Sequence, residues 1–208
     1  MIYVFKSVIF DFGNVLVKFS PEYITAPYIP KGEDAQGFNA VFFDRLYWDK
    51  LDDGSLDDET AKNLICSRLP ERLHGAARKA FDSWHLNLPY IKGMFEIVSE
   101  LKSKGVRLVL LSDISAGFAE KYCESTELAS LYDMFDGLVF SGKIHITKPS
   151  REVFEFVIDR FDIDTADCIF IDDRQENLDG AELVGIKGYL FDGDSEKLLS
   201  YLKENGII

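Results

Sequence analysis

Ser7-Val8-Ile9-Phe10-Asp11 joins a short apolar run to a carboxylate. A run of this kind is typical of a strand that is buried on both faces of a parallel sheet. The aspartate follows at once, so it falls at the carboxyl end of the predicted strand. In an open parallel sheet this end faces the ligand crevice. The segment therefore predicts a strand that carries a functional side chain.

Further strands are predicted by three later runs, at residues 107–111, 168–171 and 188–191. Apolar residues at three- and four-residue intervals predict a helix over residues 91–101, which residues 102–105, KSKG, end with basic charge and a glycine. The same spacing predicts another helix over residues 153–161, after Pro149. This alternation of strands and helices predicts an α/β fold with a Rossmann-like, doubly wound parallel sheet.

Polar side chains follow three of the predicted strands, namely Asp11, Ser112 and the pair Asp172-Asp173. One polar residue at such a place often only caps the next helix. Two adjacent carboxylates beside a third need another explanation, because uncompensated like charges cost on the order of several kcal/mol. Mg²⁺ is commonly held by one or two carboxylates together with a substrate phosphate. The strand ends therefore predict a Mg²⁺ site.

Four segments, in order along the chain, carry a family resemblance. They are VIFDFGNVL at residues 8–16, LLSD at 110–113, Lys148-Pro149, and IFIDD at 169–173 followed by Asn177, Gly180, Ala181 and Gly185. Together they resemble the motifs of the haloacid dehalogenase superfamily, and within it the phosphatases whose helical cap is inserted after the first motif. The variant Asp-x-Gly-Asn-Val in the first segment is similar to that of a group of bacterial sugar-phosphate phosphatases.

The resemblance implies a metal-binding side of the site. Asp11 matches the family's nucleophile, which is also a Mg²⁺ ligand, and the backbone carbonyl of Gly13 matches a second ligand. Asp172 and Asp173 match the remaining acidic ligands. The implied reaction is an in-line attack by Asp11 on phosphorus, which gives an aspartyl-phosphate that water then hydrolyses.

The resemblance also implies a phosphate-binding side. The Ser112 hydroxyl and the backbone N–H of Asp113 match the groups that bind the phosphoryl group. The ammonium of Lys148 matches the lysine that balances charge on Asp11 and on the transferring phosphoryl. A lone lysine is ordinarily a surface residue, so this assignment depends on the segment around it.

Gly13 departs from the family pattern. Most phosphatases of this superfamily have an aspartate two residues after the nucleophile, which protonates the leaving oxygen and then activates water. Gly13 has no side chain for this purpose, and general acid–base catalysis is typically worth about 10²–10⁴-fold in rate. The alternatives for the missing proton donor are a ligand water, the substrate and a residue of the cap.

Residues 19–89 are too long for a loop and predict a helical cap domain, with residues 1–18 and 90–208 as the catalytic core. Apolar spacing predicts one cap helix over residues 38–47 and another over residues 59–69. Residues 48–55, WDKLDDGS, predict a turn between the two helices, and Ser55 or Asp57 is expected to cap the second helix.

Several residues in or near this turn are candidates for contact with the leaving group: Trp48, Asp52 and Asp53. The alternative is an ordinary helix–turn–helix with a buried tryptophan. Trp84-His85 is a further candidate, although an isolated histidine is more often structural. Helical caps usually admit small substrates, so we expect a sugar phosphate or a similar phosphorylated metabolite rather than a phosphoprotein.

Composition restricts the partners and the compartment. The net charge of −13 disfavours nucleic acid and anionic membranes, which bind basic surfaces. Cys66, Cys123 and Cys168 have no C-x-x-C spacing and are expected to be reduced core residues. The first ten residues lack the pattern of a secretory leader, and no apolar stretch approaches the roughly 20 residues of a membrane span. We therefore expect a cytoplasmic enzyme.

Two other functions are compatible with the same fold. A dehalogenase attacks carbon without a metal, and the Asp172-Asp173 pair argues against it. A binding or regulatory domain would have lost turnover together with the carboxyl that is missing at Gly13. The dependence of activity on Mg²⁺ and on Asp11 distinguishes these alternatives from a phosphatase.

Overall fold

The computed structural model describes residues 6–29 and 32–208. The expectation about a leader falls partly on residues 1–5, outside these ranges. Within them, no helix combines the length and the apolar character that a bilayer span requires. Cys66 and Cys168 are buried as expected, but Cys123 is exposed because it lies in a one-turn helix at the surface.

The centre of the molecule is a parallel sheet with the strand order β3-β2-β1-β4-β5. Its strands are β1 (Ser7–Phe10), β2 (Arg107–Ser112), β3 (Gly137–Phe140), β4 (Cys168–Asp172) and β5 (Lys187–Leu190). The first strand lies in the middle, so Ile9 is beside Val109 of β2 and Phe170 of β4. The four predicted strands are confirmed to within one residue at each end, and β3 was not predicted.

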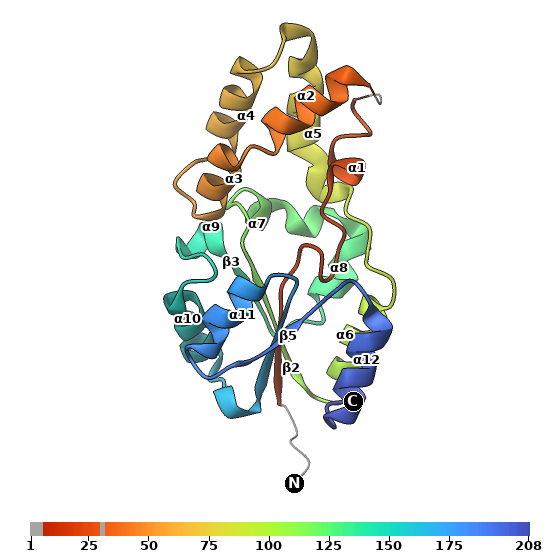
Figure 1. Ribbon diagram of the computed structural model, residues 1–208, viewed down its shortest axis with the longest axis vertical. Coiled ribbons are helices and arrows are strands. Elements are labelled where there is room, and N and C mark those ends of the chain that lie inside the picture. The colour runs from red at the N-terminus through yellow and green to blue at the C-terminus, as the bar shows by residue number, and fades with distance from the viewer. Residues whose placement is uncertain (1–5, 30–31) are drawn as a thin grey trace.

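Helices cover both faces of the sheet, and alternate residues of β1 point to different faces. Val8 and Phe10 pack in one buried cluster with α6 (Met94–Ser103) and α12 (Ser195–Glu204). Ile9 packs in a second cluster with α10 (Arg151–Phe161) and α11 (Gln175–Glu182). Figure 1 shows these two helix pairs on opposite sides of the strands. The doubly wound α/β fold is confirmed.

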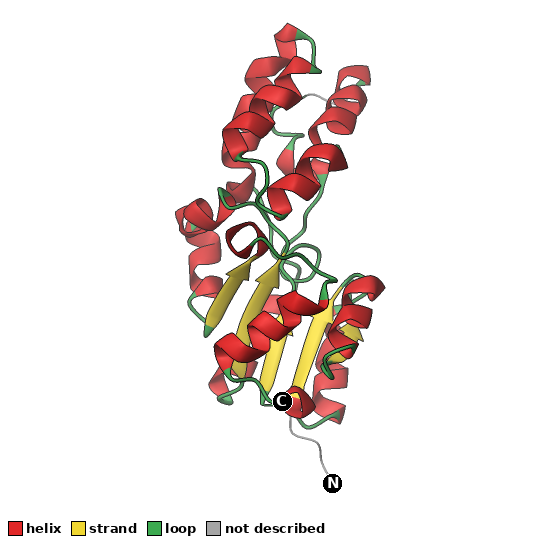
Figure 2. Ribbon diagram, turned by 90° about the vertical axis from the view of Figure 1, so that its left-hand side faces the viewer, coloured by secondary structure: helices red, strands yellow, loops and turns green. Residues whose placement is uncertain are grey.

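The segment between β1 and α6 forms a separate layer of helices beyond the carboxyl ends of the strands (Figures 1 and 2). Its helices are α1 (Pro21–Ile24), α2 (Glu33–Phe42), α3 (Arg45–Asp52), α4 (Asp58–Ser67) and α5 (His74–Ser83). Asp57 caps α4, as predicted, by accepting a hydrogen bond from the backbone of Thr60 at 2.9 Å. The exact limits of the cap domain, 19–89, stay a prediction.

The prediction of one continuous helix over residues 38–47 was wrong. The chain breaks between α2 and α3, where Asp44 is extended and its side chain accepts a hydrogen bond from Leu46 N at 3.0 Å. An aspartate at a helix N-cap satisfies a free N–H group and so favours a new start. The apolar spacing continues through the break, which is why it concealed the boundary.

Short elements complete the chain. They are α7 (Phe118–Lys121), α8 (Thr126–Tyr132), α9 (Ser141–Ile144), and 3₁₀ turns at Glu71–Leu73, Trp84–Leu86, Tyr122–Glu124 and Thr165–Asp167. The cap and the sheet share one apolar cluster through aromatic contacts. Phe12 lies 5.6 Å from Phe118, and Phe118 stacks on Trp84 at 5.1 Å between ring centroids. The helical layer therefore packs on the core instead of standing apart from it.

Candidate active site

Three neighbouring strands bring the predicted polar residues to one edge of the sheet. The register places Phe10 beside Leu110 and Ile171, so Asp11 follows at the level of Leu111 and Asp172, one residue before Ser112 on β2. The backbone N–H of Asp11 donates to Ile171 at 2.9 Å, which continues the pairing beyond the strand. The strand ends thus meet as the sequence predicts.

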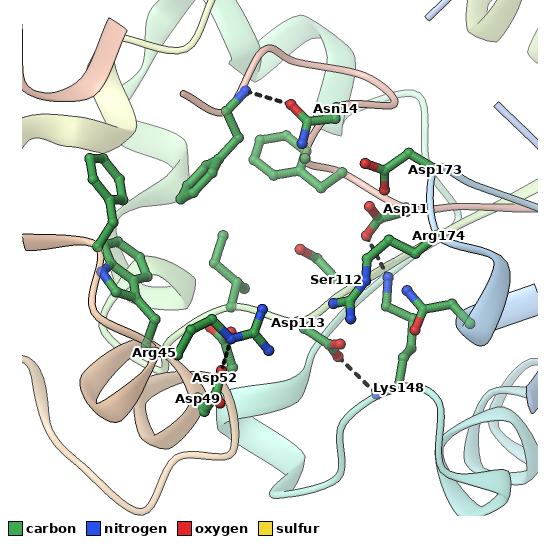
Figure 3. A pocket seen from close by; sticks show the side chains of 17 residues that line it. Asp11, Asn14, Arg45, Asp49, Asp52, Ser112, Asp113, Lys148, Asp173 and Arg174 are labelled. Atoms are coloured by element: carbon green, nitrogen blue, oxygen red, sulfur yellow. Dashed lines mark hydrogen bonds and ion pairs between the residues drawn. The ribbon is translucent and has the colours of Figure 1, made fainter. Parts of the chain in front are cut away.

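Lys148 reaches into this cluster from the loop before α10. Its Nζ lies 2.5 Å from Asp11 Oδ1 and 3.0 Å from Asp172 Oδ2, and it donates to the carbonyl of Leu111 at 3.2 Å. Its side chain is 2 % exposed, so this lysine is not a surface residue. Figure 3 shows its contact with Asp11. The structure therefore places Lys148 where the family resemblance implies.

Several hydrogen-bond donors fix the carboxylate of Asp172. Its Oδ1 accepts hydrogen bonds from Arg174 N at 2.8 Å and from Asn177 Nδ2 at 3.0 Å, and its Oδ2 also lies 3.0 Å from Asn177 Nδ2. With the contact to Lys148, this carboxylate is fully buried and oriented. A carboxylate fixed in this way is suited to present an oxygen to a ligand at a set position.

The oxygen atoms of this site suit a hard divalent cation. One carboxylate oxygen from each of Asp11, Asp172 and Asp173 lies within 4.8 Å of the others. Asn177 Oδ1 is buried without a hydrogen-bond partner among the described residues. Oxygen ligands at such spacing are those that Mg²⁺ prefers. The backbone of Gly13 lines the same pocket, so its carbonyl is available as a further ligand.

Without a cation, the acidic groups carry unfavourable charge. Burial raises the pKa of Asp11 to about 7, against the ion pair with Lys148, and the charge on Asp172 adds to the increase. Burial and then Asp172 also raise the pKa of Asp173. Burial alone would lower the pKa of Lys148, but the charges on Asp11 and Asp172 raise it. One ammonium therefore leaves excess negative charge, which a bound cation would compensate.

These groups open into a cavity of about 290 Å³ between the sheet and the cap. The core supplies its floor with Asp11, Ser112, Asp113 and Lys148. The predicted cap segment supplies the opposite wall with Phe19, Phe43, Arg45, Trp48 and Asp52. The cavity is therefore bounded by the predicted phosphate-binding residues on one side and by a mixed aromatic and charged wall on the other.

The two residues that the resemblance assigns to phosphate binding, Ser112 and Asp113, lie at the end of β2. Ser112 is 3 % exposed, and both Ser112 and Asp113 line the cavity. The Asp113 carboxylate accepts a hydrogen bond from Lys148 N at 3.0 Å, and burial raises its pKa. The side chain of Asp113 thus fixes the loop that carries Lys148.

The cap residues named from the sequence have different surroundings. Asp52 and Trp48 line the cavity, although the indole N–H of Trp48 donates to the carbonyl of Phe42 at 2.6 Å and is not available to a substrate. Asp53 accepts a hydrogen bond from Ser55 N at 2.7 Å and does not line the cavity.

Trp84 and His85 do not line the cavity either. Trp84 packs between Phe19 and Phe118, and His85 lies 3.2 Å from Glu124. Neither residue is therefore placed to contact a ligand in this cavity.

Two arginines of the cavity wall were not predicted. Arg45 pairs with Asp49 at 2.8 Å, and Arg174 pairs with Glu176. Both lie at the cavity in Figure 3. Arg174 directly follows the acidic pair, and that adjacency was a usable signal. Arg45 reaches the cavity only because the cap folds over the sheet, so the sequence held no local sign of its role.

Comparison with known proteins assigns the family. The haloacid dehalogenase-like hydrolase family matches residues 5–185. The chain belongs to this family. A sesquiterpene phosphatase of Aspergillus oryzae, astK, is 33% identical over 95 residues, which are 46% of this chain and 47% of that protein. A phosphatase of Mycobacterium tuberculosis is 24% identical over 95 residues, covering 46% and 43%. The chain thus aligns with less than half the length of these curated relatives.

Solved structures share the whole fold at lower identity. A haloacid dehalogenase family enzyme of Bacteroides thetaiotaomicron, solved with magnesium and inorganic phosphate, has a TM-score of 0.74 at 20% identity, over 93% of this chain and 98% of that one. An L-2-haloacid dehalogenase also has a TM-score of 0.74, at 16% identity, over 96% and 99%. Fold similarity alone therefore does not separate the two chemistries.

Proposed function

We propose that this chain is a Mg²⁺-dependent phosphatase that hydrolyses a small phosphomonoester through an aspartyl-phosphate on Asp11. The observation that carries the proposal is the buried Lys148–Asp11 contact of 2.5 Å beside the carboxylates of Asp172 and Asp173. A dehalogenase works without a metal and does not need the carboxylates of Asp172 and Asp173 as metal ligands. Phosphoryl transfer, in contrast, depends on balanced charge around the phosphate.

Each residue of the floor has a part in this reaction. The Asp11 carboxylate would attack phosphorus from the end of β1, and Lys148 would hold it in place and balance charge on the phosphoryl oxygens. The Ser112 hydroxyl and the backbone N–H of Asp113 would bind two of those oxygens. Asp172 is oriented by its own hydrogen bonds and would help to hold the cation.

Mg²⁺ would be held by Asp11, Asp172, Asp173 and the carbonyl of Gly13. When bound, it would neutralise the charge shared by these carboxylates and the substrate phosphate. Two observations support it: the spacing of the three carboxylate oxygens, and a structural relative that was solved with magnesium and inorganic phosphate.

The cavity supports a small substrate. Its volume of about 290 Å³ lies near the lower limit of typical ligand sites, roughly 300–1,000 Å³. The wall combines aromatic faces from Phe43 and Trp48 with the cations Arg45 and Arg174. A sugar phosphate or a similar polar metabolite matches this lining, since aromatic rings contact sugar faces and guanidinium groups bind hydroxyl and anionic oxygens.

The proposal predicts that phosphate release depends on both Mg²⁺ and Asp11. Asp11→Asn keeps the size of the side chain but removes the nucleophile, so we expect kcat/KM to fall by at least about 10³-fold on every substrate. EDTA should abolish the wild-type activity, and Mg²⁺ should restore it. Release of inorganic phosphate from a panel of phosphorylated metabolites measures both effects. Asp179→Asn, an exposed position on α11, is the matched control.

Two results would contradict the proposal. Halide release without a metal would identify a dehalogenase. Equally slow phosphate release by the wild type and by Asp11→Asn across the panel would indicate a binding or regulatory domain.

A further inference from the structure

The missing carboxyl at Gly13 leaves the leaving group without an evident proton donor. The carboxyls that line the cavity belong to Asp11, Asp49, Asp52, Asp113 and Asp173. Asp49 is paired with Arg45 at 2.8 Å, and the Asp113 carboxylate accepts from Lys148 N. Asp11 and Asp173 belong to the proposed metal site. The remaining carboxyl of the cavity is that of Asp52. Within residues 6–29 and 32–208, it makes no hydrogen bond or ion pair.

Asp52 lies across the cavity from Asp11. Figure 3 shows Asp11 and Asp52 on opposite sides, with Ser112 and Asp113 between them. In an in-line displacement the leaving oxygen departs on the side opposite the nucleophile. A proton donor for that oxygen must therefore lie on the Asp52 side of the bound phosphoryl group.

The backbone around Asp52 is tied to the core at the end of β2. The Ser141 hydroxyl donates to the carbonyl of Asp52 at 2.6 Å and accepts a hydrogen bond from Ile114 N at 2.9 Å. The ring of His145 lies 3.0 Å from the carbonyl of Asp53. Ile114 is two residues after Ser112, so a single hydroxyl links the end of α3 to the phosphate-binding strand end. Such links hold a catalytic group at a set place.

The charges around Asp52 favour its protonated form at neutral pH. Burial raises its pKa to about 7, and the charges of Asp113 and Asp49 add to this, against Arg45 and Lys148. Arg45 and Asp49 face it from its own helix, whereas Asp113 and Lys148 face it from the core. A carboxyl that titrates near the working pH is suited to both donating and accepting a proton.

We propose that Asp52 is the proton donor to the leaving oxygen and takes the place of the carboxyl that Gly13 lacks; this inference rests on the proposed phosphatase function. An oxygen of Asp11 bonds to phosphorus, the bond from phosphorus to the leaving oxygen breaks, and the Asp52 proton passes to that oxygen to give an alcohol. The Asp52 carboxylate then accepts a proton from the water that attacks the aspartyl-phosphate. The bond from Asp11 to phosphorus breaks, inorganic phosphate leaves, and Asp52 is protonated again.

The test compares two leaving groups of similar size. 4-Nitrophenolate leaves without a proton, whereas the alkoxide of benzyl alcohol needs one. We expect Asp52→Asn to lower kcat/KM on the order of 10²-fold for benzyl phosphate and less than about tenfold for 4-nitrophenyl phosphate. This constant covers only the steps up to aspartyl-phosphate formation, so slow hydrolysis of the intermediate does not mask the difference. Activity on 4-nitrophenyl phosphate also shows that the variant is folded.

Asp53→Asn is the matched control, because the adjacent carboxylate accepts from Ser55 N and does not line the cavity. It should keep the wild-type ratio between the two substrates. The wild type should lose activity on benzyl phosphate above about pH 7, following the pKa of Asp52, and Asp52→Asn should lack this decline.

Two outcomes would overturn the inference while leaving the phosphatase proposal intact. An equal loss on both substrates would mean that Asp52 only binds or positions the substrate. No loss on either would mean that water or the substrate supplies the proton. If the wild type shows no Asp11-dependent hydrolysis of any phosphomonoester, the phosphatase proposal itself fails.

Discussion

Asp52 and Asp53 are chemically identical neighbours with different surroundings. Successive residues of a helix point about 100° apart, so only one of two adjacent side chains at the end of α3 can face the cavity. The Asp53 carboxylate instead accepts a hydrogen bond from Ser55 N in the following turn. Asp52 lines the cavity, where the charge of Asp113 acts on it. The sequence shows an acidic pair, whereas the direction of the helix end selects the member that can act.

The position of Asp52 should lower the stability of the folded protein at high pH. Its pKa is raised from 3.8 to about 7 on folding, so between these values the folded state binds more protons than the unfolded state, and stability falls as pH rises. Asp52→Asn removes this penalty. We expect the stability of the variant relative to the wild type to rise by about 2–3 kcal/mol between pH 5 and pH 8, because each pKa unit is worth about 1.4 kcal/mol.

Urea unfolding at the two pH values, at one fixed Mg²⁺ concentration, measures this difference. A stability difference that is the same at pH 5 and pH 8 would show that Asp52 does not titrate in the predicted range.

At the level of elements, the end of α3 is held by a contact with the start of α9, which directly follows β3. Ser141 is fully buried, and its hydroxyl joins Ile114 N to the carbonyl of Asp52. Gly142 beside it has no room for a side chain, since a Cβ would lie 2.4 Å from Ala116 N. The first turn of α9 is thus shaped to receive the end of a cap helix.

Ser141→Ala should therefore loosen the Asp52 end of α3. The change leaves a buried N–H and a carbonyl without their partner, which costs about 1–3 kcal/mol. We expect kcat/KM to fall more for benzyl phosphate than for 4-nitrophenyl phosphate, because the proton donor is displaced while the floor of the cavity is retained. Ser200→Ala, an exposed hydroxyl on α12, is the control. An unchanged ratio of the two rates in Ser141→Ala would show that this contact does not position Asp52.

The sequence predicted the elements whose signals are local. Strands β1, β2 and β4 are apolar runs that end in polar residues, and this pattern led to the floor of the site. The edge strand β3 was missed although it is as long as β1; its first two residues are half-buried, whereas all four residues of β1 are buried. Arg45 was missed for another reason: it reaches the cavity through the packing of the cap, which no short pattern encodes.

Across the whole molecule, one apolar cluster joins the cap to the sheet. Phe12 at the end of β1, Phe118 and Trp84 form a continuous series of ring contacts, and Trp48 lies 5.8 Å from Trp84. Contacts of this kind couple two layers, because separating them would expose apolar surface on both sides. The cap is therefore expected to unfold together with the core.

This coupling can be measured with the two tryptophans of the chain. Trp48 and Trp84 both lie in the predicted cap segment, so tryptophan fluorescence reports on the cap, whereas far-UV circular dichroism reports on all helices and strands. We expect both signals to change at the same urea concentration in a single transition. An earlier fluorescence transition would show that the cap unfolds independently. Trp84→Ala should cost about 3–5 kcal/mol and shift both signals together.

Neither the backbone conformation nor close packing requires a glycine at position 13. A Cβ at this position would meet Phe19 at an ordinary contact distance of 3.5 Å, so the fold does not exclude a side chain beside the nucleophile. A donor in that place would be present whether or not the cap lies against the core. Because Asp52 belongs to the cap, both proton transfers of the proposed reaction instead require the end of α3 to be seated on Ser141.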